Sequence, residues 1–438
     1  MTTEIMPAEI TAGLAPAQSA HEREHKRPIA PAPQPVGEKQ RIVSIDVLRG
    51  FALLGILPMN IQYFSMISAA YANPTAYGNL TGANYWVWLL CHVLADEKFM
   101  TIFSMLFGAG ILLMTSRIEA TGKRSAGLHY RRMGWLIGFG LAHAYLLWSG
   151  DILFTYGMCG MVAYLARKLR PRTLLILGLL IIAVASGTLA AYGIWSQHWS
   201  VHDVQIATQD LWKPTPVQTA NEITAYRGTW IDQMKYRIPA SLQMETAFFV
   251  GFTFWRVTGL MLVGMALFKL GFFSARRPAR EYWTMIAIAL TVGIPVILYG
   301  TRRDFAHGWD FRYSFFHGAQ FNYWGSILVS LGWVGTMMLA SRVAALLVLT
   351  RRFAAVGRMA FTNYIMHTAI CTTVFYGHGF GLFGKVDRTG QFAIVLAIWA
   401  LQLVISPIWL KYFLFGPLEW LWRSLTYWQW EPFARCRH

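Results

Sequence analysis

The sequence predicts an all-α protein, a polytopic membrane helical bundle with about ten transmembrane helices and both termini in the cytoplasm. Three observations lead to this fold class. Apolar residues make up 55% of the 438 residues, and the mean hydropathy is +0.39. Apolar runs of about 20 residues, long enough to cross a bilayer core, recur along the chain. Lys and Arg cluster between these runs and give a net charge of +17, as membrane topology signals do.

The predicted spans are separated by short polar or glycine-containing segments. In chain order they cover residues 47–69, 98–116, 132–149, 152–167, 173–195, 246–268, 281–300, 323–346, 359–378 and 391–413. With cytoplasmic termini, most of the 38 Lys and Arg residues lie on the cytoplasmic side. The positive-inside rule therefore favours this orientation.

The polar segments suggest four parts. Residues 1–40 are rich in Ala, Pro, Glu and Lys and are expected to be a disordered cytoplasmic tail. Residues 41–195 form an N-terminal five-span bundle, and 196–245 an extracytoplasmic loop with short interfacial helices. Residues 246–438 form a C-terminal five-span domain that ends in an aromatic interfacial segment.

Composition also limits the class of function. The four cysteines show no CxxC pair or metal-ligand spacing, so no metal is expected. The basic residues mark topology, and nucleic acid is not expected as a partner. The lipid bilayer is the expected environment, and the sequence leaves open whether the chain forms a homo-oligomer.

Asp46 and Arg49 stand at the entrance of the first span, within RIVSIDVLRGFALLGILPMN. Charges at the edge of hydrocarbon are costly unless they pair or face water, which makes them functional candidates. An i, i+3 ion pair that only anchors the helix explains them equally well.

His143 and Asp151 are the strongest chemical pair, within GLAHAYLLWSGDIL. Eight residues of straight helix would separate them by about 12 Å, although a break at Ser149 and Gly150 would fold Asp151 back. A histidine that titrates near neutrality can act as a general base. The alternative is a histidine that only bonds a neighbouring helix.

Arg256 lies inside a span, where an unpaired guanidinium is strongly unfavourable. An acidic partner is therefore expected, with Asp151 and Glu97 as the candidates. Glu97 either pairs with Arg256 or polarises an acceptor, whereas its neighbours Asp96 and Lys98 are expected to be a solvated rim.

Other polar residues within the spans can bond across helices. For this group, interhelical hydrogen bonding is favoured over catalysis, although Tyr156 is also placed to donate to a developing oxyanion. The residues are Asn60, Tyr156, Asn363 and Tyr364.

Several motifs along the chain carry a family resemblance. They are RIVSIDVLRGFALLGILPMN, KFMTIFSMLFGAGI (98–111), GLAHAYLLWSGDILFTYG (140–157), GLMLVGMALFKLGFF (259–273), GRMAFTNYIMH (357–367) and GPLEWLWRSLTY (416–427). In this order they resemble the YeiB family of bacterial inner-membrane proteins, from residue 41 onward. That family is remotely similar to transmembrane acyltransferases, including the lysosomal heparan glucosaminide N-acetyltransferase, although the first span here lacks the histidine of other membrane acyltransferases.

The resemblance implies a bacterial inner-membrane acyltransferase that takes an acyl group from cytosolic acyl-CoA to a periplasmic, small-molecule or lipid-linked acceptor. His143, Asp151 and Glu97 are then the catalytic candidates, and Asp46, Arg49 and Asn60 the cofactor-binding candidates. Arg256, Tyr156, Asn363 and Tyr364 serve as substrate or structural polar groups. The alternatives are a transporter or flippase for an amphiphilic small molecule, which would use the buried charges as substrate sites, and a non-catalytic scaffold.

Overall fold

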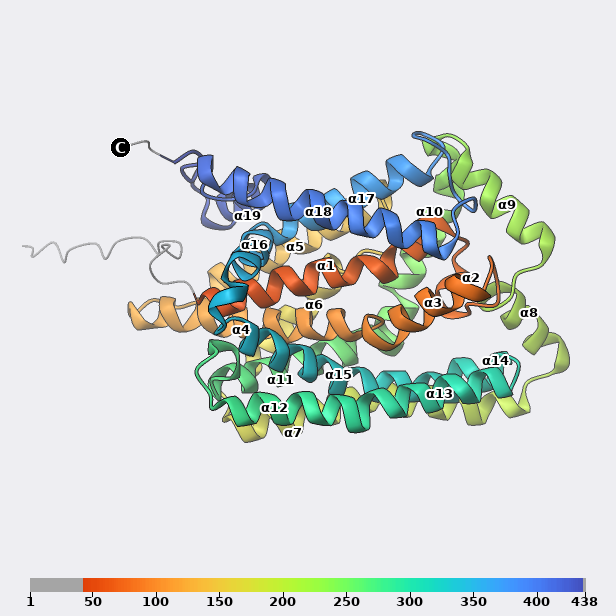
Figure 1. Ribbon diagram of the computed structural model, residues 1–438, viewed down its shortest axis with the longest axis horizontal. Coiled ribbons are helices and arrows are strands. Elements are labelled where there is room, and N and C mark those ends of the chain that lie inside the picture. Colours follow the sequence, from red (N-terminus) through yellow and green to blue (C-terminus); the bar gives the residue numbers. More distant parts are fainter. Residues whose placement is uncertain (1–41, 436–438) are drawn as a thin grey trace, which may run out of the picture. The chain divides into compact units, whose positions relative to one another are not determined.

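The computed structural model describes residues 42–435, and helices form nearly all of the regular structure in this part of the chain. The predicted all-α helical bundle is confirmed (Figure 1). The predicted tail, residues 1–40, lies outside the described residues.

A helix lies in each range predicted as a span. Seven helical segments among residues 42–435 are long and apolar enough to cross a membrane, which makes the chain a membrane protein. They include α1 (Val43–Ser65), α4 (Lys98–Ala120), α7 (Pro171–Trp195), α11 (Phe254–Lys269), α12 (Ala279–Ile288) with α13 (Ile294–Ala306), α15 (Ala319–Ala340) and α18 (Arg388–Tyr412).

Three other helices in the predicted span ranges are shorter or more polar. They are α5 (Ala126–Leu146), α6 (Leu153–Ala163) and α17 (Ala360–Phe375). α5 contains two arginines and two histidines, and α17 has 16 residues. Polar side chains within a membrane bundle are costly and are usually functional, so these helices are where a site is expected.

Shorter helices connect the long ones. They are α2 (Ala69–Ala72), α3 (Gly82–Leu94), α8 (Val201–Leu211), α9 (Pro216–Arg227), α10 (Trp230–Glu245), α14 (Phe311–Tyr313), α16 (Leu347–Arg358) and α19 (Pro417–Tyr427). Single π-helical turns interrupt the long helices at η4 (Phe249–Thr253), η6 (Ala289–Gly293) and η7 (Ser314–Gly318). The segment 196–245 thus contains short helices, and its interfacial, extracytoplasmic place stays a prediction.

α1 is the central helix, and it packs against α4, α16, α17 and α18 (Figure 1). Glycines allow the closest helix crossings. A Cβ on Gly108 of α4 would lie 2.0 Å from the carbonyl oxygen of Met261 on α11, and one on Gly264 would lie 2.0 Å from that of Met105. Small residues let the backbones of membrane helices approach this closely. Close approach increases van der Waals packing, which stabilises helix association in a bilayer, where no hydrophobic force acts between helices.

The halves on either side of residues 196–245 do not form separate units. α7 packs against α11 and α1 packs against α16, so extensive contacts join the two halves. The chain from Arg41 onward forms one compact unit. Helix contacts thus cross between the two predicted five-span parts, whose bounds stay a prediction.

The start of α1 and the helix α19 lie at the same end of this unit (Figure 1). At the opposite end, α9 and α10 cover the ends of α1 and α5. The Ser68 amide donates to Glu222 of α9 over 2.8 Å, and Arg237 of α10 donates to the carbonyl of Leu146 over 2.8 Å. The helices of segment 196–245 are therefore docked on the bundle.

Candidate functional site

The bend between α5 and α6 brings His143 and Asp151 together. α5 ends at Leu146, the chain reverses, and Asp151 Oδ1 lies 2.8 Å from His143 Nδ1. The second carboxylate oxygen accepts a hydrogen bond of 2.8 Å from the Phe154 amide, which caps the start of α6. A Cβ on Gly140 would lie 2.3 Å from the Phe154 nitrogen, so glycine permits this close crossing. The break near Ser149 and Gly150 thus folds Asp151 back onto the histidine.

Thr368 of α17 completes the arrangement, and the sequence analysis missed it. Its Oγ1 lies 2.9 Å from His143 Nε2. An ionised carboxylate only accepts hydrogen bonds, so Nδ1 of the imidazole carries the proton that faces Asp151. Nε2 of the neutral ring is then an acceptor, and the Thr368 hydroxyl donates to it. One signal was available: Thr368 follows Tyr364 by four residues and therefore shares its helix face.

The three side chains are enclosed. His143 is 3% exposed and Thr368 is 1% exposed. The rings of Tyr364 and Trp148 lie with their centroids 5.3 and 6.2 Å from the imidazole centroid. Hydrogen bonds are stronger in such low-dielectric surroundings, so the imidazole is held in one orientation.

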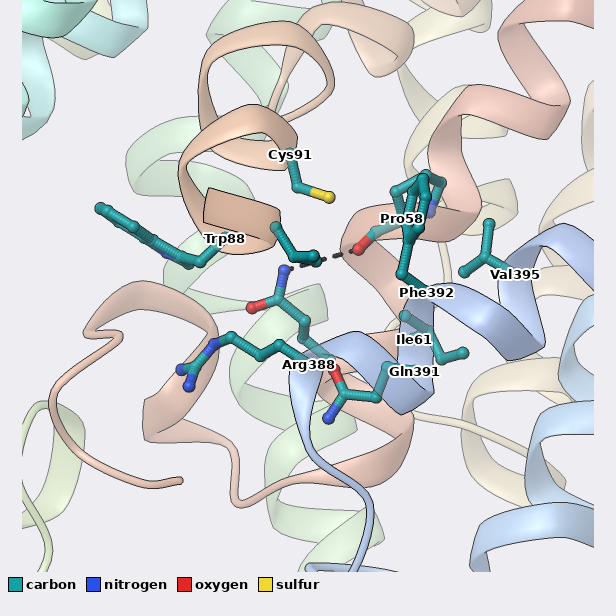
Figure 2. A pocket seen from close by; sticks show the side chains of 10 residues that line it. Pro58, Ile61, Trp88, Cys91, Arg388, Gln391, Phe392 and Val395 are labelled. Carbon is teal, nitrogen blue, oxygen red and sulfur yellow. Dashed lines mark hydrogen bonds between the residues drawn. The ribbon is translucent and has the colours of Figure 1, made fainter. Parts of the chain in front are cut away.

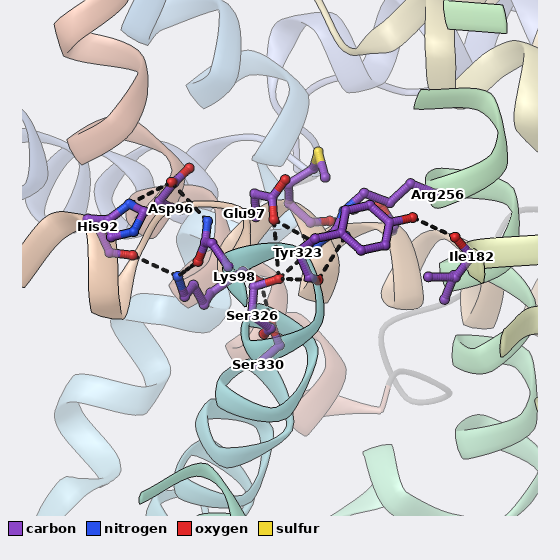
Figure 3. A network of polar contacts seen from close by, with 12 residues as sticks. His92, Asp96, Glu97, Lys98, Ile182, Arg256, Tyr323, Ser326 and Ser330 are labelled. Atoms are coloured by element: carbon purple, nitrogen blue, oxygen red, sulfur yellow. Dashed lines mark hydrogen bonds and ion pairs between the residues drawn. The ribbon is translucent and has the colours of Figure 1, made fainter. Parts of the chain in front are cut away.

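Arg256 pairs with Glu97, one of the two acids expected from the sequence (Figure 3). Its guanidinium NH2 atom lies 3.1 Å from Glu97 Oε2, and its NH1 atom donates to the carbonyl of Tyr323 over 3.0 Å. Arg256 is fully buried, whereas the Glu97 side chain is 22% exposed. Glu97 has a φ of +62° at the break between α3 and α4, a strained region for a non-glycine residue. The other expected partner, Asp151, is instead bonded to His143.

Asp96 and Lys98 are not a solvated rim, so that prediction is wrong. Lys98 is fully buried, and its Nζ donates to the His92 carbonyl over 2.6 Å and to Asn322 Oδ1 over 2.5 Å. Asp96 Oδ2 lies 3.0 Å from His92 Nδ1 and accepts from Asn322 over 3.0 Å. Both residues face α15 because α3 and α4 meet at a bend packed inside the bundle (Figure 3). Sequence position at a span entrance does not reveal this packing.

Asp46 and Arg49 form the expected i, i+3 ion pair, with Arg49 NH1 2.8 Å from Asp46 Oδ1. The Arg49 side chain is 28% exposed. Arg132 of α5 lies within electrostatic range of both Arg49 and Arg423 of α19. Arg132 thus has one guanidinium of α1 and one of α19 within electrostatic range; we call these three residues the arginine cluster, and positive charges of this kind attract anions.

Asn60 does not lie beside Asp46 and Arg49. The distance along α1 from Arg49 is roughly 16 Å at about 1.5 Å per residue. Asn60 does share a helix face with Arg49, since residues three, four or seven positions apart lie on one side of a helix. Ile56, Asn60 and Tyr63 lie on this face, and they are the partly exposed side chains among the otherwise buried residues 52–65. We call these four side chains, Arg49 included, the α1 stripe.

One end of the α1 stripe lies near α5, and the other end contacts the bend that follows α5. At one end Arg49 is near Arg132, the residue with the electrostatic contact described above. At the other end the Tyr63 hydroxyl lies 3.2 Å from the Ser149 hydroxyl, in the bend that also carries Asp151. Tyr63 therefore places one end of the α1 stripe beside the bend that carries Asp151.

Tyr156 and Asn363 lie within helix contacts. Tyr156 Oη accepts from Ser104 over 3.2 Å, and Asn363 Nδ2 donates to Ser406 over 3.0 Å. Tyr364 Oη donates to the Gly150 carbonyl over 3.5 Å. Of these candidates, only Tyr364 contacts the His143 site.

A separate small pocket lies among α1, α3 and α18 (Figure 2). The oxygens Gln62 Oε1 and Gln391 Oε1 are buried there without a hydrogen-bond partner among the described residues. The space, about 230 Å³ including its open mouth, is smaller than most small-molecule sites. The pocket is polar enough for an ordered water.

No group of three His, Cys, Asp or Glu side chains within residues 42–435 is arranged to hold a metal ion. The His143 site itself presents a carboxylate, an imidazole and a hydroxyl.

Comparison with known proteins identifies the family. The uncharacterized protein YeiB of Escherichia coli K12 is 32% identical over 401 residues, which cover 88% of this chain and 96% of that protein. The chain belongs to the YeiB family. The uncharacterized protein YxaH of Bacillus subtilis 168 is 31% identical over 430 residues, covering 92% of this chain and 98% of YxaH. An uncharacterized 39.9 kDa protein of Bacillus acidopullulyticus is 28% identical over 397 residues, covering 90% and 96%.

Residues 267–429 match a family model described as a protein of unknown function, DUF418. In this member of the YeiB family, Thr368 and Tyr364 lie inside the matched segment. His143, Asp151 and Glu97 lie outside it. The candidate site is thus assembled from the matched segment and from the part of the chain that precedes it.

Proposed function

We propose that this protein is an inner-membrane acyltransferase that moves an acyl group from a cytosolic acyl-CoA to a periplasmic or lipid-linked acceptor. The observation that carries the proposal is the buried imidazole of His143, held between Asp151 Oδ1 at 2.8 Å and Thr368 Oγ1 at 2.9 Å. A carboxylate that orients a histidine, which in turn faces a hydroxyl, is the arrangement used for acyl transfer in unrelated folds. Because fold resemblance alone does not establish function, the argument rests on this geometry.

The arginine cluster supplies the second argument. Acyl-CoA carries several phosphate groups, and guanidinium groups bind phosphate with charge-assisted hydrogen bonds. Arg132 lies within electrostatic range of Arg49 and Arg423, and Arg49 stands near the start of α1, the end expected to be cytoplasmic. His143 lies roughly 16 Å farther along α5 than Arg132, at about 1.5 Å per residue. A donor with its phosphates at the arginines would therefore extend its thioester along the α1 stripe toward His143.

The test is turnover of acyl-CoA by purified protein in detergent, measured as CoA release with a series of acyl chain lengths. We expect release that His143→Ala and Asp151→Asn each reduce at least 100-fold, the effect typical of lost general-base catalysis. His129→Asn is the matched control, since His129 is also buried on α5, where its ring bonds the carbonyl of Gly160 and stacks on Tyr164, away from Asp151 and Thr368. Arg49→Gln should raise the KM for acyl-CoA and leave kcat nearly unchanged.

Absence of binding and turnover for every acyl-CoA would refute the proposal. Counterflow of an amphiphilic substrate in proteoliposomes, without thioester cleavage, would instead establish transport.

A further inference from the structure

Both ring nitrogens of His143 already have partners, which limits what this histidine can deprotonate. Nδ1 faces Asp151 at 2.8 Å, and Nε2 faces the Thr368 hydroxyl at 2.9 Å. An external acceptor cannot approach either nitrogen without displacing one of these groups. The proton within direct reach of Nε2 is that of Thr368.

The Thr368 hydroxyl is also free of the bond that helical threonines usually make. Threonine in a helix commonly donates to the carbonyl four residues earlier, and Thr373 of the same helix does so, to Ala369 over 2.7 Å. Thr115 of α4 makes the same bond to Ile111 over 2.9 Å. In the described part of the chain, the Thr368 hydroxyl bonds His143 instead. Its rotamer is therefore fixed by the histidine rather than by its own helix.

We propose that Thr368 is the nucleophile that carries the acyl group as a covalent ester; this inference rests on the proposed acyltransferase function. Thr368 Oγ1 attacks the thioester carbonyl carbon as its proton moves to His143 Nε2. The C–S bond then breaks, and the CoA thiolate leaves with that proton. Asp151 stabilises the transient imidazolium and stays ionised.

The second half of the reaction releases the ester. An acceptor hydroxyl or amine attacks the ester carbonyl and gives its proton to His143 Nε2. The bond between the acyl carbon and Thr368 Oγ1 breaks, and the threonine takes the proton back. Donor and acceptor thus use the same histidine in sequence, and they need not occupy the site together.

Access to Thr368 requires movement of a ring. The rings of Trp148 and Tyr364 pack over the imidazole, and Thr368 is 1% exposed. Trp148 belongs to the same bend as Ser149, which Tyr63 of the α1 stripe contacts. A thioester that arrives along the α1 stripe therefore meets this bend first.

The experiment uses the full chain in detergent with chain-labelled acyl-CoA and no acceptor. We expect release of one CoA per protein and an acid-stable acyl adduct, removable by alkaline hydroxylamine, on the peptide that contains Thr368. Thr368→Ser should keep the adduct, and Thr368→Val should lose it together with at least 100-fold of the turnover. Thr373→Val and Cys371→Ser should retain both, which controls for the fold of α17 and for acylation of the neighbouring thiol.

Three results would overturn the proposal, and each has a distinct meaning. Turnover that requires acceptor, with neither adduct nor prior CoA release, would make Thr368 a proton relay in a direct transfer. Turnover that Thr368→Val leaves within threefold of the starting protein, or an adduct on another residue, would remove Thr368 from the chemistry while the acyltransferase function stands. No turnover of any acyl-CoA would reject both the function and the nucleophile.

Discussion

Replacing Glu97 by glutamine removes the negative charge that faces a fully buried arginine. Arg256 has no exposed surface, and its guanidinium lies 3.1 Å from the Glu97 carboxylate. Its remaining contacts are Ser326 Oγ at 2.8 Å, the carbonyl of Tyr323 and the ring face of Tyr323 at 4.1 Å. These contacts are neutral dipoles, so they reduce but do not cancel the charge.

The distance between the Glu97 and Arg256 charges determines how much unfolding free energy the substitution removes. Two unit charges 3.1 Å apart attract by about 5 kcal/mol at an effective dielectric constant of about 20. Removing one partner of a buried pair typically costs about 3–5 kcal/mol. Because the Glu97 side chain is 22% exposed, we expect a loss near the lower end, about 3 kcal/mol of unfolding free energy. Arg256→Met, which removes the buried cation, should restore about 2 kcal/mol in the Glu97→Gln background.

The measurement is a double-mutant cycle, with unfolding in mixed detergent and SDS micelles followed by circular dichroism. The matched control is Glu281→Gln, which breaks an ion pair with Arg277 that is 42% and 31% exposed at its two side chains. That exposed pair should contribute less than about 1 kcal/mol. A coupling energy between Glu97 and Arg256 below about 0.5 kcal/mol would refute the reasoning, since independent sites add within that limit.

Three further predictions concern Glu222 of α9, the glycine crossing of α4 with α11, and the start of α17. Burial raises the pKa of Glu222 from 4.5 to about 7, so between these pH values the folded protein keeps a proton that the unfolded chain loses. The free energy of unfolding should therefore fall by about 3 kcal/mol as the pH rises from about 4.5 to above 7. Thermal unfolding measures this change, and Glu222→Gln should abolish the pH dependence. Gly108→Ala places a methyl 2.0 Å from a carbonyl oxygen of Met261 and should cost about 1–3 kcal/mol, whereas Gly110→Ala, with open space around it, should be neutral or stabilising. Two backbone amides at the start of α17 donate to Glu419 Oε1, at 2.6 and 3.0 Å, so Glu419→Ala, which removes this acceptor, should destabilise the protein by about 1–2 kcal/mol in the same unfolding assay; an unchanged midpoint would refute the capping role.

The fold class and the helix positions follow from local features of the sequence. Apolar runs of bilayer length mark the long helices, and the charge of Arg256 inside such a run required an acid nearby. The sequence could not choose between Glu97 and Asp151, because the choice depends on which helices α11 meets. The sequence also predicted an exposed Lys98, whereas in the structure α15 covers this side chain.

In the candidate site, too, some residues were found from the sequence and one was found only in the structure. His143 and Asp151 were found from residue type and position, and the possible break at Ser149 and Gly150 was visible in the sequence. Thr368 was not found, because its one signal, the four-residue spacing from Tyr364, does not show which helix that face of α17 meets.

By itself, the sequence determined a membrane helical bundle, the positions of its long apolar helices and the residues that needed polar partners, since hydropathy and periodicity are properties of short segments. The tertiary structure decided the partners. Thr368 and His143 are 225 residues apart, and they meet because α17 packs beside the bend between α5 and α6. Such pairings depend on helix crossings set by side-chain volume at many positions together, and no local pattern encodes them.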